Sequence, residues 1–151
     1  GTVGTVGNIK VNPGVMNVIP GVAEMWVDIR GVNHDSIVET LQELKDEISI
    51  IAEAEGTTVA IEVLTSDKPV RLHPTISAAV ENACKDLKVS YRRMNSGAGH
   101  DAMHMASLCP TGMIFVPCAR GISHNPEEFA SPDDIMTGLD VLTRTVRSLA
   151  E

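Results

Sequence analysis

The sequence has few basic residues and gathers none of them into a patch. Its 151 residues include 12 Lys and Arg against 20 Asp and Glu, so the formal charge is −8 with neutral histidines. The largest basic run is the pair Arg92 and Arg93. Because affinity for nucleic acid depends on clustered cations that neutralise phosphates, this balance argues against a nucleic-acid partner.

The chain also lacks an uninterrupted apolar run. Its longest stretch without a formal charge, Ala102 to Ala119, contains Pro110, Gly112 and Pro117 and is not typical of a membrane span. The opening residues carry no positive charge of the kind that begins a signal peptide. With 43% apolar and 21% charged residues, the composition predicts a folded chain of one domain or two small ones.

Cysteine is scarce and has no zinc-like spacing. The three cysteines are Cys84, Cys109 and Cys118. Such usage is typical of a reducing compartment, so we expect a cytoplasmic location. We expect each thiol to be a buried apolar group rather than a nucleophile.

Apolar periodicity and turn residues predict an α/β chain without internal repeats. Strands are expected at 2–11, 22–30, 57–65, 89–94 and 113–116, and helices at 36–55, 74–87, 100–108 and 132–149. Helix signals include a capping box at Ser36 and Glu39, a stop at Gly56, and a cap at Ser131. The expected buried stripe of the last helix is Ile135, Leu139, Leu142, Val146 and Leu149.

Two loops are rich in residues that packing does not require. The first runs from Asn95 to Asp101 and contains Gly97 and Gly99, which allow the backbone to approach a ligand closely. Amide groups at the following helix start favour an anion or a developing oxyanion. The competing interpretation is a tight strand-to-helix connection. Ser96 lacks the G-x-S-x-G pattern of a nucleophile elbow.

The second loop runs from Gly121 to Glu128 and follows the predicted strand at 113–116. Ligands of open α/β sheets sit at the carboxyl ends of strands, so this position favours function. His124 is the candidate metal ligand there, with Ser123, Asn125 and nearby carboxylates available to fix its tautomer. The competing interpretation is an ordinary surface histidine.

A second metal hypothesis places His100 and His104 four residues apart on one helix. This arrangement is similar to the zincin H-E-x-x-H pattern, with Asp101 in place of Glu. Aspartate is one methylene shorter than the general base of such sites, which weakens this hypothesis. His34 and His73 each precede a helix, and we expect them to act as local caps.

Three motifs in order resemble one family. The segments TVGNIKVNPGVMNVIPGVAEMWVDIR, MNSGAGHDAMHMA and PTGMIFVPCARGISHNPEEFA resemble the C-terminal half of the amidase/hydantoinase/carbamoylase family. This family of dinuclear metal amidohydrolases includes N-carbamoyl-L-amino-acid hydrolases, β-ureidopropionases and allantoate amidohydrolases, which are related to aminoacylase-type and carboxypeptidase-G-type peptidases. The resemblance spans Thr2 to about Leu149.

The resemblance implies a domain organisation and a chemistry. Residues 1–67 would be part of a ferredoxin-like lid through which a homodimer forms, and 68–151 the C-terminal portion of an α/β catalytic domain. The reaction implied is hydrolysis of a linear N-carbamoyl, ureido or amide C–N bond in a small carboxylate-bearing substrate. Two divalent metal ions, Zn or Mn, would bind at each complete site. No nucleic-acid or membrane partner is expected.

The resemblance also implies roles for individual residues. Asn17 and Arg30 match lid residues that hold the substrate carboxylate, usually in the partner subunit's site, and an arginine fork suits a carboxylate. Gly99 and His100 match substrate contacts, and His100 would stabilise the transition state. His124 matches a metal ligand. The supporting residues are Asp101 beside His100 and Glu128 beside His124.

The family's other metal-binding motifs have no counterpart here. Its H-x-D motif, its acidic pair with the general-base Glu and a further metal-binding His all lie upstream of the matched segments. We therefore expect a fragment that is catalytically incomplete by itself. The alternatives are a related metal-dependent exopeptidase or deacylase, and a non-catalytic dimerisation or binding module.

Overall fold

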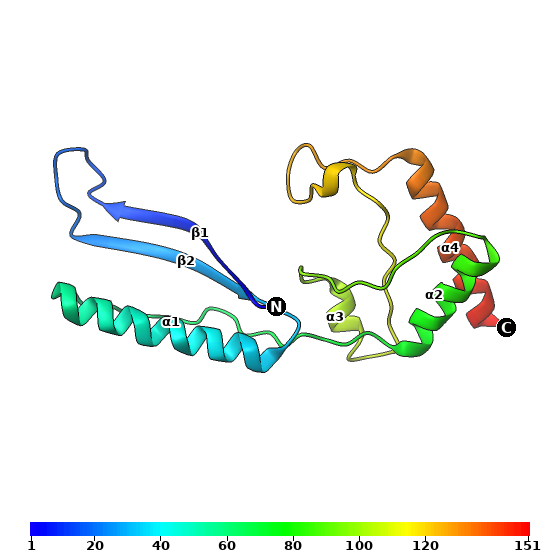
Figure 1. Ribbon diagram of the computed structural model, residues 1–151, viewed down its shortest axis with the longest axis horizontal. Coiled ribbons are helices and arrows are strands. Elements are labelled where there is room, and N and C mark those ends of the chain that lie inside the picture. The colour runs from blue at the N-terminus through cyan, green and yellow to red at the C-terminus, as the bar shows by residue number, and fades with distance from the viewer. The chain divides into compact units, whose positions relative to one another are not determined.

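A computed structural model describes residues 1–151, which form two compact units, Gly1–Pro69 and Val70–Glu151. The N-terminal unit contains the strands β1 (Val3–Asn12) and β2 (Val22–Arg30) and the helix α1 (His34–Glu55). The C-terminal unit contains α2 (Pro74–Asp86), α3 (Asp101–Met105), the short 3-10 helix η1 (Ala119–Gly121) and α4 (Pro132–Ala150) (Figure 1). Assignment of the two units to a lid and a catalytic portion stays a prediction.

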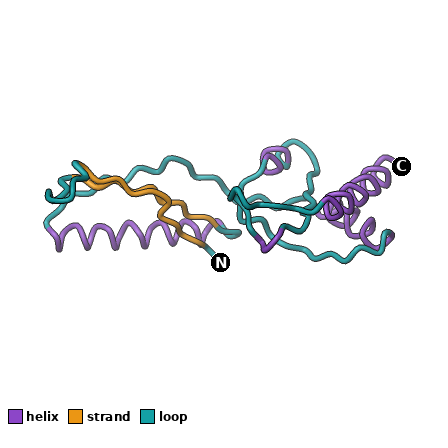
Figure 2. Tube along the Cα trace, turned by 90° about the horizontal axis from the view of Figure 1, so that it is seen from above, coloured by secondary structure: helices purple, strands orange, loops and turns teal.

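In the N-terminal unit, β1 and β2 form an antiparallel hairpin with α1 running alongside it (Figures 1 and 2). Val3 lies opposite Arg30 at one end, and Asn12 lies opposite Val22 at the other. The hairpin loop is closed by a hydrogen bond from the Gly21 N–H to the Asn12 carbonyl at 3.0 Å. The length of the two strands therefore separates the hairpin loop from the opposite end of the hairpin, where Arg30 lies.

The start of α1 differs from the prediction. The side chain of Asn33 caps the helix, because its Oδ1 accepts a hydrogen bond from the Ser36 N–H at 3.1 Å. The predicted capping box at Ser36 is wrong, since the Ser36 hydroxyl instead bonds the Thr2 hydroxyl at 2.6 Å and ties the chain before β1 to α1. The predicted stop at Gly56 is confirmed by its left-handed φ of 65°.

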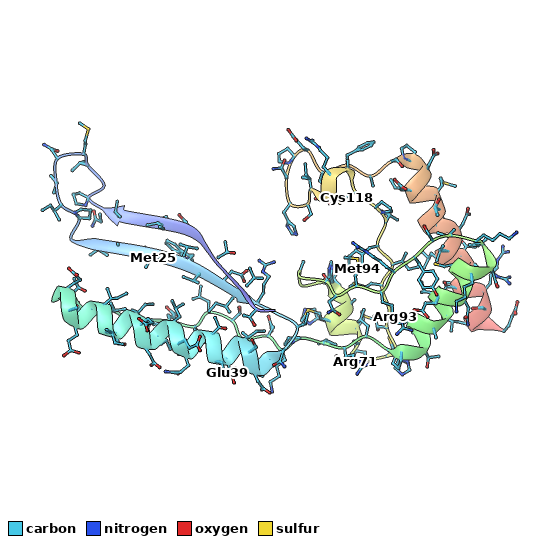
Figure 3. The ribbon with its side chains drawn as sticks, viewed as in Figure 1. Met25, Glu39, Arg71, Arg93, Met94 and Cys118 are labelled. Carbon is cyan, nitrogen blue, oxygen red and sulfur yellow. The ribbon has the colours of Figure 1, made fainter.

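The core of the C-terminal unit lies between α2 and α4. Ala83, Cys84 and Val141 are buried, and half-buried Val80, Val89 and Ile114 pack against them. Two ion pairs brace its surface. Arg144 on α4 contacts Asp86 on α2 at 2.8 Å, and Arg93 contacts Glu81 on α2 (Figure 3). The hydrogen bond from Arg93 lowers the pKa of Glu81.

The predicted buried stripe of α4 is wrong, although its cap is right. The Ser131 hydroxyl accepts a hydrogen bond from the Asp134 N–H at 3.1 Å and begins the helix. The buried residues are Val141 and Thr145, each 3% exposed. The five stripe residues are 48% to 56% exposed: Ile135, Leu139, Leu142, Val146 and Leu149. Their stripe lies about a quarter-turn from the face that meets α2, so an exposed apolar stripe adjoins the covered face of α4.

Three predicted strands, 57–65, 89–94 and 113–116, are irregular in the structure and appear as loop in Figure 2. β-branched residues favour an extended chain, but a strand also needs a hydrogen-bonded neighbour. Within residues 1–151 the only ladder joins β1 to β2. Val89 and Ile114 contribute to the core without belonging to a sheet.

No helix in residues 1–151 combines the length and the apolar character that crossing a bilayer requires. The apolar stretch from Ala102 onward, considered as a span from sequence, contains only the short α3 and irregular backbone.

Gly138 allows α4 to approach Val116. A Cβ at Gly138 would lie 2.5 Å from Val116 Cγ1, well inside van der Waals contact. Overpacking of this kind costs about 1–3 kcal/mol, which exceeds the gain of about 1 kcal/mol that alanine brings to a helix. We expect Gly138→Ala to lower the free energy of unfolding by about 1 kcal/mol in urea denaturation.

The matched control is Asp140→Ala, an exposed position on the same helix that makes no hydrogen bond or ion pair. It should leave the urea midpoint unchanged or slightly raised, because alanine has a helix propensity more favourable than that of aspartate by up to about 0.7 kcal/mol. A more stable Gly138→Ala variant would mean that the Val116 side chain yields freely, and would contradict the close packing of α4.

Candidate functional site

The loop before α3 folds around the Ser96 hydroxyl. Ser96 Oγ lies 2.7 Å from Nε2 of His100 and accepts a hydrogen bond from the Ala98 N–H at 3.1 Å. The His100 ring also meets Phe115 edge-on, with 5.7 Å between ring centroids and 62° between their planes. His100 is half-buried, and these two contacts restrain its imidazole from two sides.

α3 is shorter than the sequence predicted. It ends at Met105, and turns continue the chain to Cys109. His100 precedes the helix with an extended backbone, φ −141° and ψ 156°. A helix of five residues has little macrodipole, so the expected anion site at its start is not supported.

The competing metal hypothesis for His100 and His104 fails on this geometry. Side chains four residues apart share a face only when both residues are helical, and His100 lies outside α3. Asp101 is exposed, and its carboxylate makes no hydrogen bond or ion pair. It therefore gives His100 no side-chain support within this chain.

The loop that carries His124 is closed at its base. The Ala119 N–H donates to the Phe129 carbonyl at 2.7 Å, one residue after Cys118 (Figure 3). Three of its residues have left-handed backbones, with φ 58° at Arg120, 69° at Gly121 and 55° at His124. Left-handed φ is uncommon outside glycine, and strain of this kind clusters at functional sites.

Glu128 supports the His124 backbone rather than its ring. Glu128 Oε2 accepts a hydrogen bond from the His124 N–H at 2.8 Å, while Asn125 Oδ1 accepts one from the Glu127 N–H at 2.9 Å. The His124 imidazole is exposed and makes no hydrogen bond. The expectation that neighbouring carboxylates fix its tautomer is therefore wrong for Glu128, whose bond instead holds the backbone conformation.

A metal site cannot be completed from this chain. Within residues 1–151, no group of three or more His, Cys, Asp or Glu side chains could hold an ion. The uncommitted imidazole of His124 has the chemistry of a single ligand. Tetrahedral zinc sites need three or four protein ligands, so the other donors would have to come from outside these residues.

The structure does not bring Asn17 and Arg30 together. Asn17 lies in the hairpin loop, and Arg30 ends β2 at the opposite end of the hairpin. Eight residue steps from Val22 to Arg30, at about 3.3 Å each, separate the two ends by about 26 Å. The guanidinium of Arg30 pairs with Asp28, two residues back on the same face of the strand. One small carboxylate cannot reach both side chains in a single chain.

The remaining predictions about histidine and cysteine are partly right. His73 caps α2, since its Nδ1 accepts from the Thr75 N–H at 3.3 Å. His34 is no cap, and its Nδ1 is buried without a partner. Cys84 is buried, which raises the pKa of its thiol. Cys118 is half-buried and Cys109 is exposed, so the expectation of a buried thiol fails for Cys109.

Sequence reasoning did not anticipate the contacts of Ser96 and Phe115 with His100. The sequence patterns test Ser96 only as a nucleophile and place Phe115 only in a predicted buried strand. The signal available was the four-residue spacing from Ser96 to His100 across two glycines, which lets the loop turn back on itself.

The profile of peptidase family M20/M25/M40 matches residues 1–148. The chain belongs to this family. A hydrolase of Haemophilus influenzae without an assigned substrate is 48% identical to it over 99% of the chain and 36% of that protein. An N-carbamoyl-L-amino-acid amidohydrolase of a Pseudomonas species is 37% identical over 96% of the chain and 35% of that enzyme.

A solved member of the amidase, hydantoinase/carbamoylase family from Burkholderia vietnamiensis superposes with a TM-score of 0.91 at 37% identity, over 97% of this chain and 36% of that one. The predicted α/β class and the resemblance are therefore confirmed. The chain spans about a third of the length of the curated relatives it matches. Membership in the M20 family implies dependence on divalent metal ions.

Proposed function

We propose that this chain is part of a metal-dependent amidohydrolase that cleaves linear N-carbamoyl, ureido or amide C–N bonds in small carboxylate-bearing substrates. The observation that carries the proposal is the match along nearly the whole chain to an N-carbamoyl-L-amino-acid amidohydrolase. Fold alone would not support an activity, since one fold hosts many reactions. The two loops with His100 and His124 give the proposal its residues.

His124 contributes one ligand to a site for two divalent ions, Zn or Mn. When bound, such ions polarise the substrate carbonyl and activate water at neutral pH. The left-handed backbone at His124, held by Glu128, presents an imidazole with no other partner. A metal ligand whose companion ligands lie outside these residues needs such an uncommitted imidazole.

His100 and Gly99 contact the substrate. With Nε2 engaged by Ser96, the Nδ1 atom of His100 is the nitrogen left for a ligand. A Cβ added at Gly99 would meet only Met103 Sδ, at 3.9 Å, so packing within the chain does not require glycine there. A glycine with open space beside it suits close approach of a substrate to the backbone.

Asn17 and Arg30 hold the substrate carboxylate. The hairpin keeps them about 26 Å apart in one chain, so we propose that they serve one substrate from two copies of a homodimer formed through the N-terminal unit. At each site the guanidinium would exchange Asp28 for the substrate or bind both carboxylates at once. A cytoplasmic location stays a prediction from cysteine usage.

The second candidate function is a metal-dependent exopeptidase or deacylase, which the peptidase family name favours. Both candidates use the same carboxylate contacts and differ in the bond cleaved. A non-catalytic dimerisation module is the third, and it would use the hairpin without the two histidine loops.

The test is an assay of the full-length protein that carries this segment. With added Mn²⁺ or Zn²⁺, we expect release of ammonia from N-carbamoyl amino acids or ureido acids and much slower cleavage of dipeptides and N-acetyl amino acids. The 151-residue chain alone should show no turnover on any of them. Cleavage of dipeptides faster than that of N-carbamoyl amino acids would favour the exopeptidase function. Inactivity of the full-length protein on every substrate would favour the binding module.

A further inference from the structure

Ser96 makes more contacts than a connecting loop needs. Its Oγ lies 2.7 Å from His100 Nε2, 3.1 Å from the Ala98 nitrogen and 3.1 Å from the Ala98 carbonyl oxygen. Both Ser96 and His100 are half-buried. The hydroxyl therefore sits between the backbone two residues ahead and the imidazole four residues ahead.

The single hydroxyl proton has a preferred direction. The Ala98 N–H can only donate, so it occupies a lone pair of Ser96 Oγ. Two acceptors then remain for the hydroxyl proton, the Ala98 carbonyl oxygen and His100 Nε2. At 3.1 Å the carbonyl lies beyond the usual O–H···O range of about 2.5–3.0 Å, whereas the ring nitrogen lies at 2.7 Å. The shorter distance favours donation to the ring nitrogen over donation to the Ala98 carbonyl.

A ring nitrogen that accepts a hydrogen bond is unprotonated. The neutral imidazole of His100 then carries its proton on Nδ1, because the hydrogen bond at one nitrogen sets the tautomer. Phe115 meets the ring edge-on and restricts its rotation. Nδ1 makes no hydrogen bond within the chain, so it remains a donor for something outside.

We propose that Ser96 is a positioning residue that holds His100 in the Nδ1–H tautomer, with Nδ1 as the hydrogen-bond donor to the carbonyl oxygen of the bound substrate. This rests on the proposed function for the part that His100 plays. An oxyanion developing on that oxygen needs a donor already in place, and donors of this kind are costly to lose. The opposite tautomer would present a lone pair to the same oxygen and repel it.

Ser96 could instead be a nucleophile activated by His100. A serine nucleophile needs a third group that orients the base, and no carboxylate contacts Nδ1 of His100. The Ala98 N–H also occupies one lone pair of Oγ. The two roles differ in their response to threonine, which keeps the positioning hydroxyl but crowds a nucleophile.

The first test measures the tautomer directly in the full-length protein. Its histidines are labelled with ¹⁵N, and long-range proton–nitrogen spectra are recorded about two pH units above the ordinary histidine pKa of about 6.5. We expect a protonated Nδ1 and an unprotonated Nε2 at His100. Ser96→Ala should remove this preference, and Ser96→Thr should keep it.

Ser107→Ala is the matched control, because the Ser107 hydroxyl also bonds locally, to the His104 carbonyl at 2.7 Å, and does not touch His100. It should leave the His100 tautomer unchanged. A protonated Nε2 in the unsubstituted chain would overturn the proposal whatever the variants do. An unchanged tautomer in a folded Ser96→Ala variant would overturn it as well.

Kinetics of the full-length protein separate this inference from the proposed function. Loss of a group that orients a metal-ligating histidine costs about 10–100-fold, and we expect an effect of similar size here. Ser96→Ala should lower kcat by that factor with little change in KM, and Ser96→Thr should restore it. Loss of activity in Ser96→Thr, or labelling of Ser96 by a fluorophosphonate, would overturn the positioning role in favour of a nucleophile. A tautomer that switches while kcat stays constant would support the positioning and overturn the role proposed for His100.

Discussion

Replacing His124 by alanine in the full-length protein is expected to abolish metal binding at one ion and to lower kcat by more than about 100-fold. Loss of a residue that merely supports a metal ligand costs about 10–100-fold, and loss of a ligand itself costs more. Metal per protomer, measured by mass spectrometry of the dialysed protein, and kcat are the two readouts. His104→Ala should keep both values, since His104 lies exposed on α3 and not in the loop that carries His124.

Two further variants separate the ring of His124 from its backbone. Asparagine tolerates the left-handed φ of 55°, so His124→Asn should preserve the loop and lose metal as completely as alanine does. Glu128→Gln keeps an oxygen that can accept the His124 N–H and should retain metal. Metal loss in Glu128→Gln would make Glu128 itself a ligand. Metal loss in His104→Ala alone would revive the zincin-like pair.

Elements that depend on local signals could be predicted from sequence. Ser131 with Pro132 and the glycine at 56 act within one turn of their helices, and the structure bears them out. The strands at 57–65, 89–94 and 113–116 could not be predicted this way, because pairing depends on segments distant in sequence. Residues 1–151 offer these segments no partner.

The wrong stripe on α4 has a related cause. Periodicity identifies apolar faces, but the partners available decide which face is covered. The exposed apolar stripe of α4 adjoins a face that contains Gly138, and this second face is covered because only a residue without a side chain permits the approach to Val116. The exposed stripe gives the stronger sequence signal, since all five of its side chains are aliphatic, whereas the covered face includes Gly138 and Thr145.

For the candidate site, sequence located the loops but not the contacts inside them. The strand-to-helix position and the glycines pointed to His100, and the loop after 113–116 pointed to His124. The spacing from Ser96 to His100 indicates that the two side chains can meet, but which ring nitrogen is engaged depends on the positions of Ser96 Oγ and Phe115 in the structure. The role of Glu128 as a backbone acceptor likewise follows only from the left-handed conformation of His124.

The separation of Asn17 and Arg30 leads to a prediction about the loss of each side chain. In the full-length protein, Asn17→Ala and Arg30→Ala should each lower kcat/KM for a carboxylate substrate. Removal of the charge-assisted contacts of Arg30 should cost about 1.5–3 kcal/mol, which is about 10- to 150-fold. The uncharged amide analogue of the substrate should lose much less. Equal losses for acid and amide would mean that Arg30 serves only its pair with Asp28.

Mixing the two variants tests whether one site draws on two copies. In a symmetric dimer whose sites each combine Arg30 of one copy with Asn17 of the other, a mixed dimer has one site with both residues intact and one with neither. A purified mixed dimer should therefore recover about half of the unsubstituted activity, and a random mixture about a quarter. If both residues came from the same copy, every site would lack one of them and no activity would return. That second outcome would require the hairpin to bring Asn17 to Arg30, against the about 26 Å that its register imposes.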